Sequence, residues 1–152
     1  MRLWVFAVGR ERDSAVETLV DRYRERSPWP LKLETVDVKK GLKGQALKAA
    51  EGELLLGKVP ESARIVALDE RGDDLTSVQL AVRLGKWRDT GSRDIAFLIG
   101  GADGFDARIR ERADLVLRLG RLTWPHMMVR AMLAEQLYRA QMILSGHPYH
   151  RP

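Results

Sequence analysis

Two kinds of hydrophobic spacing alternate along the chain. Apolar runs of about six residues are followed by longer stretches in which apolar positions recur every three or four residues, as in strands and amphipathic helices. This alternation is typical of an α/β protein with a mainly parallel sheet flanked by helices. The pattern predicts strands at residues 2–8, 31–38, 64–69, 94–99 and 115–119. It predicts helices at residues 12–26, 44–57, 76–89, 106–113 and 125–144.

Two of the predicted strands are apolar throughout, I-V-A-L at residues 65–68 and I-A-F-L-I at residues 95–99. Strands covered on both faces have this composition, so we expect both inside the sheet. Residues 31–38 alternate apolar and polar side chains, which predicts an edge strand. No repeat, low-complexity run or linker interrupts the pattern, and we expect residues 1–152 to form one domain.

Three loops follow the carboxyl ends of predicted strands, where open α/β sheets bind ligands. They read D-E-R-G at residues 69–72, G-G-A-D-G at residues 100–104 and G-R-L-T-W-P-H at residues 120–126. Glycine lets backbone groups approach a ligand closely, which suits a nucleotide-like molecule. G-G-A-D-G matches neither the dinucleotide-binding pattern nor Walker A. Taken alone, such a loop is more often a tight turn than a cofactor site.

The last predicted helix is apolar around most of its circumference. At about 100° per residue, polar side chains such as Arg130, Glu135 and Arg139 scatter around the axis instead of sharing one face. Such a helix must be buried on more than one side. Packing on the sheet and on a second subunit would bury it, and ordinary core packing gives the same pattern.

The chain is basic, with a formal net charge of +5, and 19 of its 26 basic residues are arginine. This balance favours a polyanionic partner such as RNA, although a GC-rich genome also enriches arginine. The basic segment K-K-G-L-K-G at residues 39–44 either lies near phosphate or is simply a solvated connection. The chain has no cysteine, and its first apolar stretch is too short for a signal peptide or a membrane span. We therefore expect a cytoplasmic protein with no membrane association.

All three histidines lie near the end of the chain, at His126, His147 and His150. The spacing of His147 and His150 differs from that of a helical zinc pair, Pro148 breaks a helix between them, and no acidic third ligand is adjacent. We expect no metal site. No serine lies in the sequence context of a catalytic nucleophile.

Four strings in this chain resemble one family. They are L-I-G-G-A-D-G at residues 98–104, T-W-P-H at 123–126, V-R-A-M-L-A-E-Q-L-Y-R-A at 129–140 and H-P-Y-H-R at 147–151. Together with the start R-L-W-V-F-A-V-G and the strand I-V-A-L-D, they resemble the RlmH family over essentially the whole chain. This is the SPOUT-superfamily group that methylates a pseudouridine of 23S ribosomal RNA. Each string is weak by itself, but their order and spacing make the combination specific.

The resemblance implies a C-terminal trefoil knot, within about residues 64–144, which is an exception to the rule that chains are unknotted. It implies a homodimer that binds S-adenosylmethionine in the knot, through the three loops described above. The implied cofactor contacts are Leu68, Gly100, Leu119, Gly120, Arg121, Leu122, Thr123 and Trp124. One departure follows the D-E-R-G loop, where many relatives carry a lysine and this chain has Asp73 and Asp74.

The acceptor that the family implies is N3 of a pseudouridine within the ribosome, an imide nitrogen whose proton must leave. A base or a group that stabilises the anion is therefore expected near the methyl donor. The candidates are His126 in the turn and Tyr149, His150 and Arg151 in the tail, which would serve the neighbouring subunit if it crosses a dimer interface. Alternatively, His126 caps or orients the last helix, and Tyr149 contributes only packing.

A different class of function also fits these features. A non-catalytic RNA-binding protein with a SPOUT-like fold would have the same basic surface and the same loops. Binding of S-adenosylmethionine discriminates between the two. A flavodoxin-like nucleotide enzyme is disfavoured because neither common phosphate-binding pattern is present.

Overall fold

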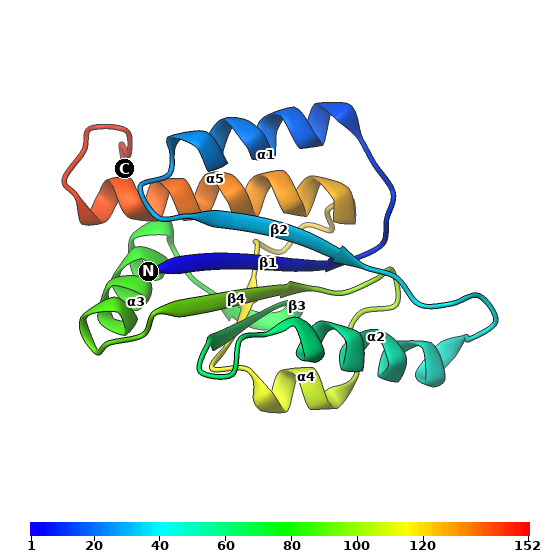
Figure 1. The fold of residues 1–152 in the computed structure, drawn as a ribbon. Helices are drawn as coiled ribbons and strands as arrows, with labels where there is room; N and C mark the ends of the chain where they lie inside the picture. The colour runs from blue at the N-terminus through cyan, green and yellow to red at the C-terminus, as the bar shows by residue number, and fades with distance from the viewer.

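A computed structural model describes every residue from Met1 to Pro152 and contains a five-stranded parallel sheet with helices on both faces (Figure 1). The strands are β1 (Arg2–Val8), β2 (Leu31–Val36), β3 (Arg64–Asp74), β4 (Asp94–Ile99) and β5 (Leu115–Arg118). The helices are α1 (Ser14–Arg26), α2 (Gly44–Lys58), α3 (Ser77–Asp89), α4 (Ala107–Arg112) and α5 (His126–Leu144). None of these helices is both long enough and apolar enough to span a membrane. The predicted α/β class is confirmed.

The order of strands in the sheet is β2-β1-β4-β3-β5. Both strands predicted to be internal, β3 and β4, have neighbours on each side, and every residue of β4 is buried. The alternating strand β2 lies at an edge, as its pattern predicts. Successive side chains of a strand point to opposite faces, so the sheet contributes to two cores.

The first core lies between the sheet and α1, α3 and α5, where Leu3 and Val5 of β1 meet Leu84 and Leu137. The second lies under α2 and α4, where Phe6 of β1 packs with Leu55 and Ile109. In Figure 1, α1 and α5 run side by side above the sheet, and α2 and α4 lie below it. This arrangement leaves the carboxyl ends of the strands accessible at one edge of the sheet.

Capping residues explain where several helices begin. The Asp13 side chain accepts hydrogen bonds from the N–H groups of Ala15 (2.9 Å) and Val16 (3.2 Å), so α1 begins at Ser14 rather than at residue 12. Thr76 and Gln79 form a capping box at the start of α3. Side-chain oxygens at these positions satisfy backbone donors that have no partner inside the helix.

The prediction for the third strand is wrong at its end. Residues 69–72 were expected to form a loop after a strand at 64–69, but β3 continues to Asp74. The strand changes register against β5 between Leu68 and Asp73, and then pairs Asp74 with Arg118. Residues 69–74 are polar and have a low intrinsic strand propensity, but pairing with β5 holds them in an extended conformation. The second strand is shorter than predicted, since β2 ends at Val36 rather than at residue 38.

Helix α5 is buried chiefly within its own chain. It packs against α1 and α3 as well as the sheet, which accounts for most of its apolar circumference without a second subunit. The buried Arg130 guanidinium donates hydrogen bonds to the carbonyl oxygens of Val8 (3.1 Å) and Gly9 (2.9 Å) at the end of β1. Among the large apolar residues of α5, Met128 remains 45% exposed.

The starts of β1 and β4 are joined by the buried carboxylate of Asp94. It accepts hydrogen bonds from Arg2 Nε and Nη2 and from Trp4 Nε1, each at 2.8 Å. The hydrogen bond from Arg2 is the main reason why the pKa of Asp94 is lowered. Burial acts in the opposite direction and raises the pKa, and the hydrogen bond from Trp4 lowers it further. Because the folded pKa is depressed, this contribution to stability is present above the unfolded pKa of about 3.9 and is lost as pH falls through the folded value.

We expect Asp94→Asn to lower the free energy of unfolding by about 1–3 kcal/mol at pH 7, because hydrogen bonds to a charged partner are lost. Urea titrations from pH 7 to pH 2 should show this difference shrinking below about pH 4, as the wild-type carboxylate is protonated. The control is Asp89→Asn, which removes an exposed carboxylate paired only with its neighbour Arg88. A constant difference at all pH values would contradict the role of the charge.

Candidate active site

One cavity of about 1040 Å³ is lined by residues 68–71 of β3 and by the loops that follow β4 and β5. This cavity contains all eight positions at which the family resemblance implies cofactor contacts. They are Leu68, Gly100, Leu119, Gly120, Arg121, Leu122, Thr123 and Trp124. His126 also lines it, whereas Tyr149, His150 and Arg151 do not.

The loop between β5 and α5 forms one wall of the cavity. The indole Nε1 of Trp124 donates to the carbonyl oxygen of Leu119 at 2.9 Å, which closes the loop on itself. Gly120 has φ of +80°, a conformation that side chains with a Cβ rarely adopt. Leu122 is 72% exposed, so this wall presents apolar surface beside its backbone groups. Backbone polar groups together with apolar side chains are the composition expected of a pocket for a small organic ligand.

Asp74 fixes the basic residues on the other side of this loop. Its carboxylate accepts from Arg118 Nη2 at 2.6 Å and lies 3.6 Å from Arg121 Nε. The hydrogen bond from Arg118 is the main cause that lowers the pKa of Asp74, which keeps the carboxylate ionised. Asp74, one of the two acidic residues at the departure noted in the sequence, thus contacts arginines before and within the loop between β5 and α5.

The Gly100–Gly104 loop forms the opposite wall, and a buried carboxylate lies behind it. Glu51 on α2 is 8% exposed, and a Cβ atom added to Gly101 would lie only 2.9 Å from Glu51 Oε2. Burial is the main cause that raises the pKa of Glu51; the carboxylates of Asp103 and Asp37 add to the increase, and the backbone N–H of Gly101 partly offsets it. Burial and like charges both disfavour the ionised form.

His126 is the first residue of α5 and lies between the cavity and the end of β1. Its Nε2 atom is buried without a hydrogen-bond partner, close to the α-carbon of Gly9. The N-cap position of α5 is Pro125, and no side chain makes a capping hydrogen bond there. The capping alternative for His126 therefore finds no support in the hydrogen bonds of the structure.

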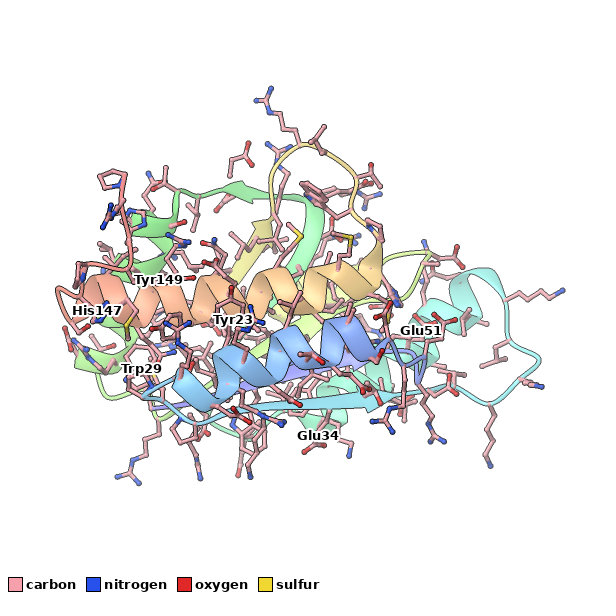
Figure 2. All side chains as sticks on the ribbon, turned by 90° about the horizontal axis from the view of Figure 1, so that it is seen from above. Tyr23, Trp29, Glu34, Glu51, His147 and Tyr149 are labelled. Atoms are coloured by element: carbon pink, nitrogen blue, oxygen red, sulfur yellow. The ribbon has the colours of Figure 1, made fainter.

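The tail folds back on the C-terminal half of α5 (Figure 2). The Tyr149 hydroxyl donates to Glu135 Oε1 at 2.9 Å, and its ring packs edge-on against Tyr138 with centroids 4.8 Å apart. Arg139 bonds to the same Glu135 carboxylate and lies 3.2 Å from His150 Nδ1. Burial and then the bond to Glu135 raise the pKa of Tyr149, which keeps its hydroxyl protonated. Tyr149 thus packs within its own chain, and Arg151 is exposed.

The four predicted catalytic residues do not meet within one chain. His126 and Glu135, to which Tyr149 is bound, lie about 14 Å apart along the axis of α5, at about 1.5 Å per residue. Figure 2 shows Tyr149 and Glu51, which lies behind the cavity, at opposite ends of the molecule. The structure thus brings His126 to the cavity and leaves the tail outside it.

An apolar groove of about 500 Å³ lies between the cavity and the tail. It is bordered by Leu19 and Tyr23 of α1, by Leu75 and by Met128 and Glu135 of α5. Leu119 and Gly120 line both this groove and the cavity, so the two depressions share a wall. A group bound in the groove would therefore contact the loop between β5 and α5 on the side away from the cavity.

Several residues of the cavity were not predicted from the sequence. Glu11, Lys48, Arg71 and Arg110 all line it. Only Arg71 lies in one of the three loops singled out by the strand pattern, and the others come from a connection and from helices. None of the four lies in the basic segment at residues 39–44, and no motif in the sequence singles them out. No group of three His, Asp or Glu side chains is placed to hold a metal ion.

Comparisons with known proteins agree with this geometry. Residues 1–150 match the family described as "Predicted SPOUT methyltransferase". The ribosomal RNA large subunit methyltransferase H of Rhodospirillum centenum is 58% identical over 99% of each chain. The protein of the same name from Paramagnetospirillum magneticum is 56% identical over the full length of both.

A solved structure from Bacillus anthracis, described as an RNA methyltransferase, has a similar fold. The match covers 99% of this chain and 98% of the Bacillus anthracis chain. Its TM-score of 0.54 at 14% identity supports the fold alone. The family match spans nearly the whole chain, and the relatives align from end to end. This chain belongs to the SPOUT methyltransferase family.

Proposed function

We propose that this protein transfers a methyl group from S-adenosylmethionine to N3 of a pseudouridine in 23S ribosomal RNA of the large subunit. The observation that carries the proposal is the cavity lined by β3 and by the loops after β4 and β5, in a chain closely related to large-subunit rRNA methyltransferases. The basic net charge of +5 suits an RNA substrate in the cytoplasm, where ribosomes work.

The cavity suits this methyl donor in size and chemistry. Its 1040 Å³ is at the upper end of the range of small-molecule sites. Backbone groups at Leu68, Gly100 and Leu119 are available to hydrogen-bond adenine and ribose, while Leu122 and Trp124 supply apolar cover. Bound there, S-adenosylmethionine would supply a methyl group on a sulfonium, which is transferred by in-line displacement.

The remaining chemistry falls to the protein's own side chains. The acceptor nitrogen must lose its proton, so nearby positive charge or a base lowers the barrier. His126 stands at the cavity, and His150 and Arg151 are suited to hold the RNA or to stabilise the anion. Tyr149 would stack on a base once the tail is released from its packing against Tyr138.

The distance between the tail and the cavity supports a homodimer. A tail that lies about 14 Å along α5 from His126 cannot act on its own cavity without moving, but it can act on a neighbour's. The occupant that we assign to the apolar groove is a second copy of this chain, because the groove shares Leu119 and Gly120 with the cavity and adjoins Glu135, which holds the tail. An isologous interface would then pair each tail with the partner's cofactor.

We also infer that residues 1–152 form one SPOUT domain whose knot lies within about residues 64–144. Support comes from the single sheet, the two cores on its faces and a family match over residues 1–150. The close approach of β3 and β5 backbones at Gly72 lies inside this range.

The decisive experiment uses ribosomes that lack the modification. Incubation with the protein and labelled S-adenosylmethionine should label one nucleotide of 23S rRNA, which primer extension and mass spectrometry would identify as a pseudouridine methylated at N3. Free 23S rRNA and isolated large subunits are the comparison substrates. Labelling of another RNA, or of a different atom, would overturn the substrate.

A non-catalytic RNA-binding protein is the competing function. Calorimetric titration with S-adenosylmethionine separates the two, because a binding module has no need of a methyl donor. Binding at a 1:1 ratio per chain is the expected result. An absence of binding, with the protein folded, would favour the non-catalytic function.

A further inference from the structure

We propose that Glu51 of α2 is a positioning residue that holds the Gly100–Gly104 loop in its cofactor-binding conformation from outside the cavity. The proposal rests on the proposed function, because it assumes that this loop contacts S-adenosylmethionine. Glu51 itself is not among the residues that line the cavity.

Glu51 differs from the other buried charged residues. Asp94 is paired with Arg2, Asp106 with Arg108, and the Arg130 guanidinium donates to two backbone carbonyls. Glu51 is 8% exposed, yet none of the ion pairs in the structure includes it. A buried carboxylate without a cation is costly, so it persists only where something else requires it.

The carboxylate lies against the backbone of the loop. A Cβ on Gly101 would fall 2.9 Å from Glu51 Oε2 and 3.1 Å from Oε1, so the two oxygens occupy the space that the missing side chain leaves free. The backbone of Gly101 also partly lowers the pKa of this carboxylate, as a nearby N–H does. A shift of Gly101 toward α2 would therefore require the carboxylate to move.

The other side of Gly101 is fixed by the loop itself. The N–H of Gly104 donates to the carbonyl oxygen of Gly101 at 3.0 Å, and Gly104 has φ of +79°. Gly101 is thus held between a tight turn and the Glu51 carboxylate, and the adjoining Gly100 faces the cofactor cavity. Removing the carboxylate leaves only the turn to define the backbone that S-adenosylmethionine meets.

The position of helix α2 is fixed by contacts with the start of α4 and with the second core. Arg108 Nη2 donates to the carbonyl oxygen of Ala49 at 3.2 Å, which ties α2 to the segment that follows the loop. Gly52, next to Glu51, lets α2 approach Asp106 and Ile109 closely, since a Cβ there would be 3.4 Å from each. Leu55, one turn farther on, is fully buried in the second core.

The test compares Glu51→Ala with Glu51→Gln in calorimetry and steady-state methylation. We expect Glu51→Ala to weaken S-adenosylmethionine binding and raise its KM about tenfold, the equivalent of about 1.4 kcal/mol, with kcat within about threefold of wild type. Glu51→Gln should stay within about threefold on both constants, because glutamine keeps nearly the same shape beside Gly101 and its amide oxygen can still accept a hydrogen bond. Glu53→Ala, an exposed glutamate on the same helix, is the matched control and should change neither.

A merely structural role for Glu51 predicts a different result. It would lower the melting temperature of Glu51→Ala without changing KM, and that outcome overturns the proposal. Equal damage from Glu51→Gln and Glu51→Ala would also overturn the proposal, because glutamine fills the same space beside Gly101. If wild-type protein fails to bind S-adenosylmethionine at all, it is the proposed function that fails.

A second measurement covers the case in which Glu51→Ala does not fold. Gly101→Ala places a methyl group 2.9 Å from Glu51 Oε2, so the carboxylate must move, and cofactor binding should weaken by about threefold. The double variant Glu51→Gln/Gly101→Ala keeps the clash, whereas Glu51→Ala/Gly101→Ala relieves it. Binding in the second double variant should exceed that of Gly101→Ala alone, and strictly additive losses would contradict direct contact.

Discussion

Gly72→Ala is expected to destabilise the protein by more than about 4 kcal/mol, enough to remove most of the stability of a domain of this size. A Cβ at this position would lie 2.6–2.7 Å from backbone atoms of Val116 and Leu117. Backbone cannot yield as a flexible side chain does, so β3 and β5 would have to separate where they pair. Urea denaturation followed by circular dichroism would measure the loss.

The matched control is Gly57→Ala, in α2, where nothing lies within 4 Å of the added methyl group. That variant should equal the wild type or exceed its stability by up to about 1 kcal/mol, because alanine loses less backbone entropy in a helix. A Gly72→Ala protein within about 1 kcal/mol of wild type would contradict the close approach of the two strands.

Mixing two inactive variants is expected to restore methylation. Arg151→Ala leaves the cavity intact but removes an exposed cation of the tail. Gly100→Val leaves the tail intact but distorts the cavity, since even its Cβ would lie 3.2 Å from the Phe105 ring. Each variant alone should lose at least about 100-fold in kcat/KM, the usual effect of losing a stabilising charge or a binding loop.

If the tail serves the partner's cavity, a mixed dimer contains one intact site, which combines the cavity of one chain with the tail of the other. Refolding the variants together at equal amounts should recover about a quarter of wild-type activity, because half of the dimers are mixed and each has one of two sites. A control for the loss of charge is the mixture of Arg93→Ala with Gly100→Val, because Arg93→Ala also removes an exposed arginine but lies outside the tail. No recovery beyond the separate variants would place each tail on its own cavity.

The hydrophobic pattern predicted most of the fold, because it records which faces of strands and helices are buried. It could not predict the continuation of β3. Residues 69–74, D-E-R-G-D-D, have neither apolar alternation nor strand propensity, and they become strand through pairing with β5 and the ion pair between Asp74 and Arg118. Long-range pairing of this kind leaves no local signal.

The candidate site was predicted in part. The rule that ligands bind at the carboxyl ends of strands found the three loops, and the family resemblance named eight positions that the cavity contains. Glu51 could not be found in this way, because in sequence it is indistinguishable from the exposed Glu53 two residues later. Nor could periodicity show that the tail folds back onto Glu135 instead of approaching His126.

Helix α5 follows every strand of the sheet in the sequence, and it is fastened to segments more than 100 residues before it. Arg130 binds the carbonyl groups at the end of β1, and Gln141 accepts from the N–H of Trp29 at 2.7 Å. The loop that precedes α5 is also a wall of the cavity. During translation, the first core and this cavity therefore stay incomplete until α5 has emerged from the ribosome and packed against α1 and α3.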